Sequence, residues 1–230
     1  MSTALDGSPA GRVAIVTGGS RGVGRATIRR LAARGYAVVV NYLHDQRAAE
    51  STVEVILADN GDAVAVRADV ADDLDVNRLF AETIAAFGGI DVVVHAVGSQ
   101  NTATPVTEVD LDEFDALMRT NTRATFVVNR EAARYLRNGG AIVNLSNSPG
   151  GSSLRTHGVY AATKAITDVL TRALALELRE RDITVNAVAV EVGRPCAPDQ
   201  VADVITYLLS DQGHRLTGQV LRVGDPVLRP

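Results

Sequence analysis

The chain has 230 residues, 46% of them hydrophobic, and its 23 basic residues are nearly balanced by 27 acidic ones. This length suits one domain with a large core, while the charge balance and the lack of an apolar run of about 20 residues argue against nucleic-acid or membrane partners. The single cysteine, Cys196, excludes an internal disulfide framework, and the N-terminal residues lack the pattern of a secretion signal, so we expect a protein of the reducing cytoplasm.

We expect a flexible polar tail over residues 1–10, followed by one domain over residues 11–230. Short runs rich in β-branched residues predict buried strands at 13–16, 37–40, 63–66, 91–94, 141–145, 183–188 and 220–223. Amphipathic segments between them predict helices near 23–34, 45–59, 73–87, 111–137, 158–181 and 199–210. This alternation predicts a doubly wound α/β Rossmann fold, with a seven-stranded, mainly parallel sheet and helices on both faces. Ligands of such sheets bind beyond the carboxyl ends of the strands.

A glycine-rich turn, Thr-Gly-Gly-Ser-Arg-Gly-Val-Gly, follows the first predicted strand over residues 17–24. Gly18, Gly22 and Gly24 are spaced as G-x3-G-x-G directly before a helix. Small residues at this place let the backbone approach a pyrophosphate, and the helix N-terminus supplies positive potential. Glycines here also fit a turn that only bends sharply, so the turn by itself fits both interpretations.

The residue that ends the second predicted strand indicates which dinucleotide such a turn would hold. An acidic side chain there binds the ribose 2′-hydroxyl of NAD and repels a 2′-phosphate, but this chain has Asn41. Arg21 and Ser20 in the turn are able to bind a phosphate, so we predict that NADP(H) is preferred over NAD(H). Arg21 also fits the role of a solvated surface cation.

Tyr160 and Lys164 stand four residues apart in a predicted helix, which places their side chains on one face, one turn apart. A free tyrosine has a pKa near ~10, and a neighbouring cation favours the phenolate and lowers that value. The pair is therefore a candidate acid for proton transfer near neutral pH. By itself, this spacing is also common on ordinary solvated helices.

Together these residues resemble the pattern of the short-chain dehydrogenase/reductase family, and the chain is especially similar to its 3-oxoacyl-carrier-protein reductase and glucose-dehydrogenase-like members. The resemblance extends from Arg12 to Val223, nearly the whole chain. Its carriers are residues 17–24, 39–42, 68–70, Gly98, 120–121, the Tyr160 and Lys164 pair, 183–187 and 216–219.

The resemblance implies a role for each matching residue. Tyr160 is the expected proton donor, Lys164 is expected to lower its pKa and to bind the nicotinamide ribose, and Asn121 to hold a water of a proton relay. Asp69 and Val70 are expected to contact adenine. Taken in isolation, Asn121 also fits an ordinary helix amide and Asp69 a strand-end cap. No metal is expected, and the remaining cofactor residues are expected to be Gly18, Ser20, Arg21, Gly22, Val23, Gly24, Asn41, Tyr42, Gly98 and Val192.

Three departures from the family pattern bear on activity, and the first lies thirteen residues before Tyr160. The family has a serine there that binds the substrate carbonyl, whereas this chain has Asn147. Alternation along a strand turns Ser146 and Ser148 to the other side, so Asn147 has to donate from its own longer, planar amide. A misplaced donor costs about 3 to 4 kcal/mol of transition-state stabilisation, which predicts slowed chemistry or a displaced substrate.

The other two departures follow the fourth and sixth strands. Where the family has Asn-Asn-Ala-Gly, this chain has His-Ala-Val-Gly over residues 95–98, and we interpret His95 as a packed, hydrogen-bonded core group. After Val190 the chain passes through residues 191–195 almost directly into the next helix, so the substrate lid of the family is missing. An open site stays wet, which weakens its electrostatic contacts, but it accepts a bulky or carrier-borne carbonyl substrate.

We therefore expect an NADP(H)-dependent oxidoreductase that transfers hydride between nicotinamide and a ketone or alcohol, with Tyr160 as acid/base. Two alternatives stay open: a cofactor-binding regulatory or assembly protein with little turnover, and a non-redox biosynthetic enzyme such as a dehydratase, cyclase or epimerase. Family members pair their long helices, here 111–137 and 158–181, across twofold axes, so we expect a homodimer or homotetramer. Packing of the same apolar residues on their own sheet is the other interpretation.

Overall fold

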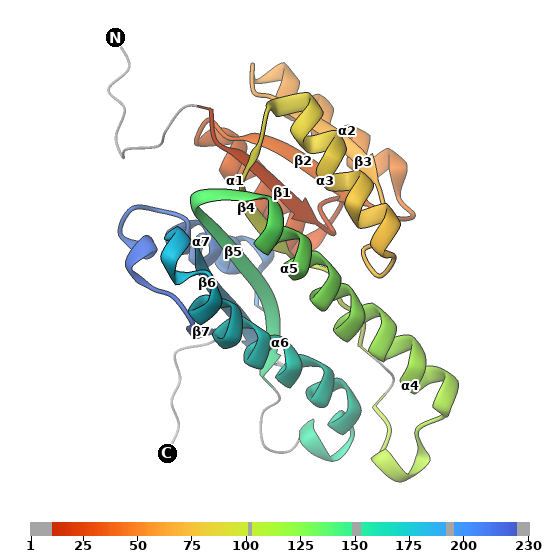
Figure 1. Cartoon of the computed structure of the whole chain (residues 1–230). Coiled ribbons are helices and arrows are strands. Elements are labelled where there is room, and N and C mark those ends of the chain that lie inside the picture. The colour runs from red at the N-terminus through yellow and green to blue at the C-terminus, as the bar shows by residue number, and fades with distance from the viewer. Residues whose placement is uncertain (1–10, 101–102, 149–152, 192–195, 225–230) are drawn as a thin grey trace.

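The computed structural model describes residues 11–100, 103–148, 153–191 and 196–224. Its strands form one sheet in the order β3-β2-β1-β4-β5-β6-β7, in which every neighbouring pair is parallel. The predicted doubly wound Rossmann fold is therefore confirmed (Figure 1). The strands are β1 Val13–Thr17, β2 Ala37–Tyr42, β3 Ala63–Arg67, β4 Ile90–His95, β5 Leu136–Ser148, β6 Thr184–Glu191 and β7 Val220–Val223.

Helices cover both faces of this sheet and bury two separate cores (Figure 1). The helices α3, α5 and α6 pack on one face, and α1, α2 and α7 pack on the other. Successive strand residues alternate between the two cores, so the central strands are apolar almost throughout. The helices are α1 Gly22–Ala33, α2 Gln46–Ala58, α3 Asp73–Phe87, α4 Leu111–Leu117, α5 Ala124–Tyr135, α6 Gly158–Glu177 and α7 Pro198–Leu208.

The region predicted as one helix over 111–137 differs from that expectation. A π-helical turn, Met118–Arg123, separates α4 from α5, and β5 already begins at Leu136. A π turn adds one residue to a helical turn, which shifts the apolar period too little to be visible in the sequence. Asn121 lies in this π turn, and its side chain is fully buried.

The carboxyl ends of β1, β4, β5 and β6 lie at one edge of the sheet, because all pairs are parallel. β1 pairs with β2 on one side and with β4 on the other, so the winding reverses there. Of the helices that the structure describes, none combines the length and the apolar character needed to cross a bilayer. The domain division stays a prediction, and the tail over residues 1–10 lies outside the described part.

Candidate active site

The turn between β1 and α1 has the geometry of an anion-binding turn. Gly18 and Gly22 have φ angles of +64° and +54°, a region that side-chain-bearing residues rarely adopt. A Cβ on Gly24 would lie 2.3 Å from the carbonyl oxygen of Gly18, so only glycine lets the helix approach the turn this closely. Arg21, which precedes α1, is extended and offers no side-chain cap. The first amides of α1 are therefore available to an anion.

Gly19 is a constrained residue that the sequence analysis did not single out. A Cβ there would lie 2.5 Å from Cδ1 of Ile28, and the Gly19 amide donates to the carbonyl oxygen of Asn41 at 2.9 Å. The neighbouring Ser20 is buried, Arg21 is exposed, and Val23 packs partly against the core under α1. The sequence signal for this constraint is that Gly19 is the second glycine of a Gly-Gly pair in the turn.

At the end of β2, Asn41 is buried and carries no charge. Its Nδ2 donates to the carbonyl oxygens of Ala68 at 3.1 Å and Val66 at 3.4 Å, on and just after β3. The amide thus ties β2 to the loop that follows β3. Tyr42 is buried in the core that includes α1 and α2, so its ring is a packing group in this structure.

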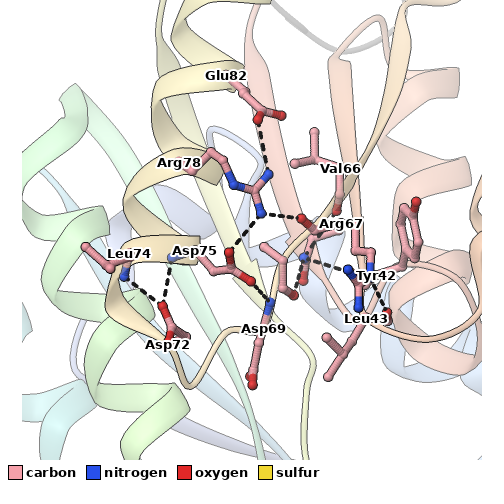
Figure 2. A network of polar contacts seen from close by, with 12 residues as sticks. Tyr42, Leu43, Val66, Arg67, Asp69, Asp72, Leu74, Asp75, Arg78 and Glu82 are labelled. Carbon is pink, nitrogen blue, oxygen red and sulfur yellow. Dashed lines mark hydrogen bonds and ion pairs between the residues drawn. The ribbon is translucent and has the colours of Figure 1, made fainter.

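Asp69 belongs to a polar network at the exit of β3, in which its amide faces Asp75 (Figure 2). Its carboxylate accepts from the Ala71 amide at 2.9 Å and from Arg119 at 2.8 Å, and its own amide donates to Asp75 at 2.8 Å. Burial raises the pKa of Asp69, but the hydrogen bonds from Arg119 and Ala71 outweigh it, so the pKa lies below its ordinary value. Asp69 therefore fixes this loop, and buried Val70 anchors it in the core.

Arg78 of α3 holds the same loop from the other side (Figure 2). Its guanidinium pairs with Asp75 at 2.9 Å and Glu82 at 3.1 Å, and it donates to the carbonyl oxygen of Arg67 at 2.8 Å. The loop after β3 is thus connected to α3 as well as to the π turn. The adenine contact expected of Asp69 and Val70 stays a prediction.

Tyr160 and Lys164 lie one turn apart near the start of α6, and both are buried, with 5% and 3% of their surfaces exposed. The Lys164 ammonium lies 6.0 Å from the centroid of the Tyr160 ring. Lys164 is the only lysine among the 23 basic residues, a signal that the sequence analysis did not use. Arginine cannot replace it as a titratable cation, because guanidinium keeps its proton at any physiological pH.

The expected lowering of the Tyr160 pKa is wrong for this structure. Burial raises the pKa of Tyr160 to about 12, and Lys164 does not offset this effect. Burial also lowers the pKa of Lys164 to about 8, partly offset by the carboxylate of Asp168. The tyrosine therefore holds its proton at neutral pH, whereas the lysine titrates just above it.

Asn121, in the π turn, connects three elements around Lys164. Its Oδ1 accepts from the Ser99 amide at 2.8 Å, and its Nδ2 donates to the Ser99 carbonyl oxygen at 2.8 Å and to Thr163 Oγ1 at 3.1 Å. A Cβ on Gly98 would lie 2.8 Å from the Lys164 ammonium and 3.3 Å from Asn121 Oδ1. The structure thus brings Asn121, Gly98 and the Tyr160 and Lys164 pair together, and π turns often occur at functional sites.

His95, at the end of β4, is a hydrogen-bonded core group, as predicted. Its Nδ1 lies 2.9 Å from Thr17 Oγ1, and only 1% of its surface is exposed. Burial and the charge of Lys164 lower the pKa of His95 to about 3, so its ring is neutral. Its Nε2 has no hydrogen-bond partner among the described residues.

Asn147 and Ser146 face opposite sides of β5, as alternation predicts. Asn147 Nδ2 donates to the carbonyl oxygen of Val190 on β6 at 3.2 Å. Ser146 is fully buried, and its hydroxyl donates to Asp168 of α6 at 2.7 Å. The substrate role of Asn147 stays a prediction, and the side chain of Ser148 and all of Val192 lie outside the described residues.

Comparisons with known proteins agree with this geometry. Residues 18–192 match the family model described as enoyl-(acyl carrier protein) reductase. Versicolorin reductase 1 of Aspergillus parasiticus is 42% identical over 255 residues, covering 95% of this chain and 97% of that protein. A hydroxynaphthalene reductase-like protein of Metarhizium majus is 40% identical over 79% of this chain and 68% of that protein.

Solved structures give the same result. A dehydrogenase/reductase from Sinorhizobium meliloti 1021 is 33% identical, with a TM-score of 0.86 over 94% of both chains. A short chain dehydrogenase from Burkholderia cenocepacia J2315, solved in complex with NADP, is 31% identical, with a TM-score of 0.84 over 94% of this chain and 97% of that one. The fold and these relatives together show a Rossmann-fold oxidoreductase. The chain belongs to the short-chain dehydrogenase/reductase family.

Two glycine-to-alanine substitutions should differ in their cost to stability, because the added Cβ meets backbone atoms at one position and the end of a side chain at the other. Gly24→Ala sets a Cβ against the backbone of Gly18, which cannot move away, so the free energy of unfolding should fall by about 1 to 3 kcal/mol. Gly98→Ala meets the flexible end of Lys164, so it should cost less than about 1 kcal/mol. Urea denaturation measures both, and equal losses would contradict these packing contacts.

The buried ammonium should make stability depend on pH. Lys164 keeps its proton to a higher pH in the unfolded chain than in the folded chain, where its pKa is about 8. The free-energy cost of burying the charged ammonium therefore applies in full below about pH 8 and falls as the pH rises and the folded lysine loses its proton. The wild type should gain about 2 kcal/mol of unfolding free energy between about pH 7.5 and about pH 9.5. Lys164→Met should lack this gain, as measured by urea denaturation across that range. A parallel pH dependence in the two proteins would refute the assignment to Lys164.

Proposed function

We propose that this protein is an NADP(H)-dependent oxidoreductase that transfers hydride between nicotinamide and a ketone or alcohol. The observation that carries the proposal is the meeting of Tyr160, Lys164, Asn121 and Gly98 at the sheet edge where the turn after β1 also lies. An acid, a cation and an anion-binding turn at one edge fit a reaction on a dinucleotide.

The residues present fit a dinucleotide. The uncapped N-terminus of α1 offers amides for a pyrophosphate, and a Cβ on Gly22 would meet nothing within 4 Å, so this side of the turn is open. Neutral Asn41 at the end of β2 does not repel a 2′-phosphate, and exposed Arg21 is available to pair with one. These features and the NADP complex of the Burkholderia relative support NADP(H) over NAD(H).

The proposed chemistry assigns one task to each residue. When bound, a dinucleotide would supply or accept the hydride. Tyr160 holds a proton on its hydroxyl across the physiological range and donates it to the oxygen of a carbonyl substrate. Lys164 adds a positive charge one helical turn from that phenol and binds the ribose of the cofactor. Asn121 holds the loop around Gly98 in place and supports the proton relay.

The substrate that we propose is a bulky or carrier-borne ketone. β6 ends at Glu191 and α7 begins at Pro198, which leaves little chain for a lid between them. The alignment with versicolorin reductase 1 spans 255 residues, so at least 25 aligned positions have no counterpart in this 230-residue chain. The short connection between β6 and α7 supports an open site. The names of the reductase relatives favour an aromatic ketone among such substrates.

A second candidate function is cofactor binding with little turnover, in a regulatory or assembly role. The observation in its favour is that the Asn147 amide donates to the carbonyl oxygen of Val190 on β6, so one of the two N–H groups of the expected carbonyl donor is already in use. A non-redox reaction, such as dehydration, cyclisation or epimerisation with Tyr160 as acid/base, is compatible with the same residues.

We also propose that the protein forms a homodimer or homotetramer in the cytoplasm. Of the apolar residues on α6, Leu174 packs into the core beneath the helix, but Val169 and Leu176 are 61% and 76% exposed. On neighbouring α5, Phe126 is 49% exposed. Helices that show such residues to solvent fit a contact with a second copy. Light scattering after size exclusion tests this, and a monomer at micromolar concentration would overturn it.

Replacing the acid tests the enzymatic proposal. Tyr160→Phe removes only the hydroxyl, so NADPH should still bind while the rate of NADPH oxidation with aromatic diketones, quinones or β-ketoacyl thioesters falls at least about 100-fold. Fluorescence titration measures binding and absorbance loss measures turnover. Wild-type binding without turnover on the whole panel would favour the second candidate, and turnover retained by Tyr160→Phe would refute the role of Tyr160.

The same assay tests Asn147. If its amide is poorly placed for the substrate, Asn147→Ser should raise kcat by about 10-fold or more, because a well-placed donor is worth several kcal/mol in the transition state. A fall in kcat would instead show that the natural amide contacts the substrate. Thr163→Ser, which keeps the hydroxyl that binds Asn121, serves as a conservative control in the same site.

A further inference from the structure

Lys164 is a buried cation with little direct support from hydrogen bonds. Its ammonium is 3.5 Å from the carbonyl oxygen of Leu145, the outer limit of a hydrogen bond. Burying an ammonium costs several kcal/mol unless an opposite charge or good hydrogen bonds offset the loss of water. Some other group therefore has to help keep this lysine protonated.

Asp168 is placed to do this. It lies four residues after Lys164 on α6, so the two side chains share one face, one turn apart. Ser146, fully buried on β5, donates its hydroxyl to Asp168 Oδ1 at 2.7 Å. This hydrogen bond from the neighbouring strand fixes the carboxylate between β5 and α6, instead of leaving it to turn toward water.

We propose that Asp168, held by Ser146, is a positioning residue that keeps Lys164 charged and directed into the active site. This inference rests on the function proposed above for Lys164. Asp168 acts only through the lysine and needs no contact with substrate or cofactor. The proposal also gives Ser146 a task, although it lies next to the position where a substrate-binding serine is expected.

The other titratable groups around Lys164 do not serve this purpose. On α6, Tyr160 keeps its proton, because its pKa is raised to about 12. On β4, His95 is neutral, with a pKa lowered to about 3 by burial and by Lys164 itself. The carboxylate of Asp168 raises the pKa of Lys164 against the larger lowering by burial. Without it, Lys164 would lose its proton nearer to neutral pH.

The single lysine makes the test direct. Protein grown with ¹³C-labelled lysine gives one set of ε-methylene signals, whose chemical shift reports the protonation of Lys164. The wild-type midpoint should lie near pH 8. Asp168→Asn keeps the shape and the hydrogen bond from Ser146 but removes the charge, so the midpoint should fall by about one pH unit. Ser146→Ala should lower it by less, and Asp168→Glu should restore most of it.

Glu177→Gln is the matched control, because it removes a carboxylate from the exposed end of the same helix and should leave the midpoint unchanged. Circular dichroism checks that each variant is folded. If Asp168→Asn leaves the lysine midpoint at the wild-type value, or if Glu177→Gln moves it equally, the proposal is overturned.

The titration needs neither cofactor nor substrate, so its result is independent of whether the proposed enzymatic function holds. If turnover is found, the alkaline limb of the pH profile of kcat should move to lower pH in Asp168→Asn by the same amount as the lysine signal. An unchanged limb, with a shifted lysine midpoint, would overturn the part of the proposal that links Asp168 to catalysis.

Discussion

The burial of one ammonium group, that of Lys164, is the constraint on which the rest of the site depends. The residues around this ammonium make room for it, add no second positive charge, or supply a negative one. Gly98 leaves room for the ammonium, neutral His95 avoids a second cation, and Asp168 adds a negative charge. A lysine with so little exposure lowers stability, and proteins keep such costly groups mainly at functional sites.

The same burial sets the acid and base character of the site. Tyr160 holds its proton strongly, so the protein by itself favours the acid form of the phenol. The Lys164 ammonium lies 6.0 Å from the centroid of that ring, and burial lowers its own pKa to about 8. At the other end of the proposed site, the turn before α1 presents glycines and uncapped backbone amides. Asp69 fixes the loop after β3, and Asn121 fixes the loop around Gly98.

Much of this arrangement could be predicted from the sequence, because apolar runs, helical periods and the glycine turn are local signals. The π turn at Asn121 could not, since one extra residue hardly disturbs the apolar period. The partner of Ser146 depends on which face of β5 meets α6, which only the sheet register decides. The spacing of Tyr160 and Lys164 predicts the wrong direction for the pKa of Tyr160, because the burial that raises it depends on the folded chain and not on the local sequence.

A crystal structure of the protein with NADP⁺ would show whether the acid and the cation face the cofactor. We expect the pyrophosphate to lie on the first amides of α1, with the Tyr160 hydroxyl and the Lys164 ammonium both within hydrogen-bond distance of the nicotinamide ribose. A dinucleotide bound elsewhere on the protein, or one bound at α1 with Lys164 directed away from the ribose, would contradict this expectation.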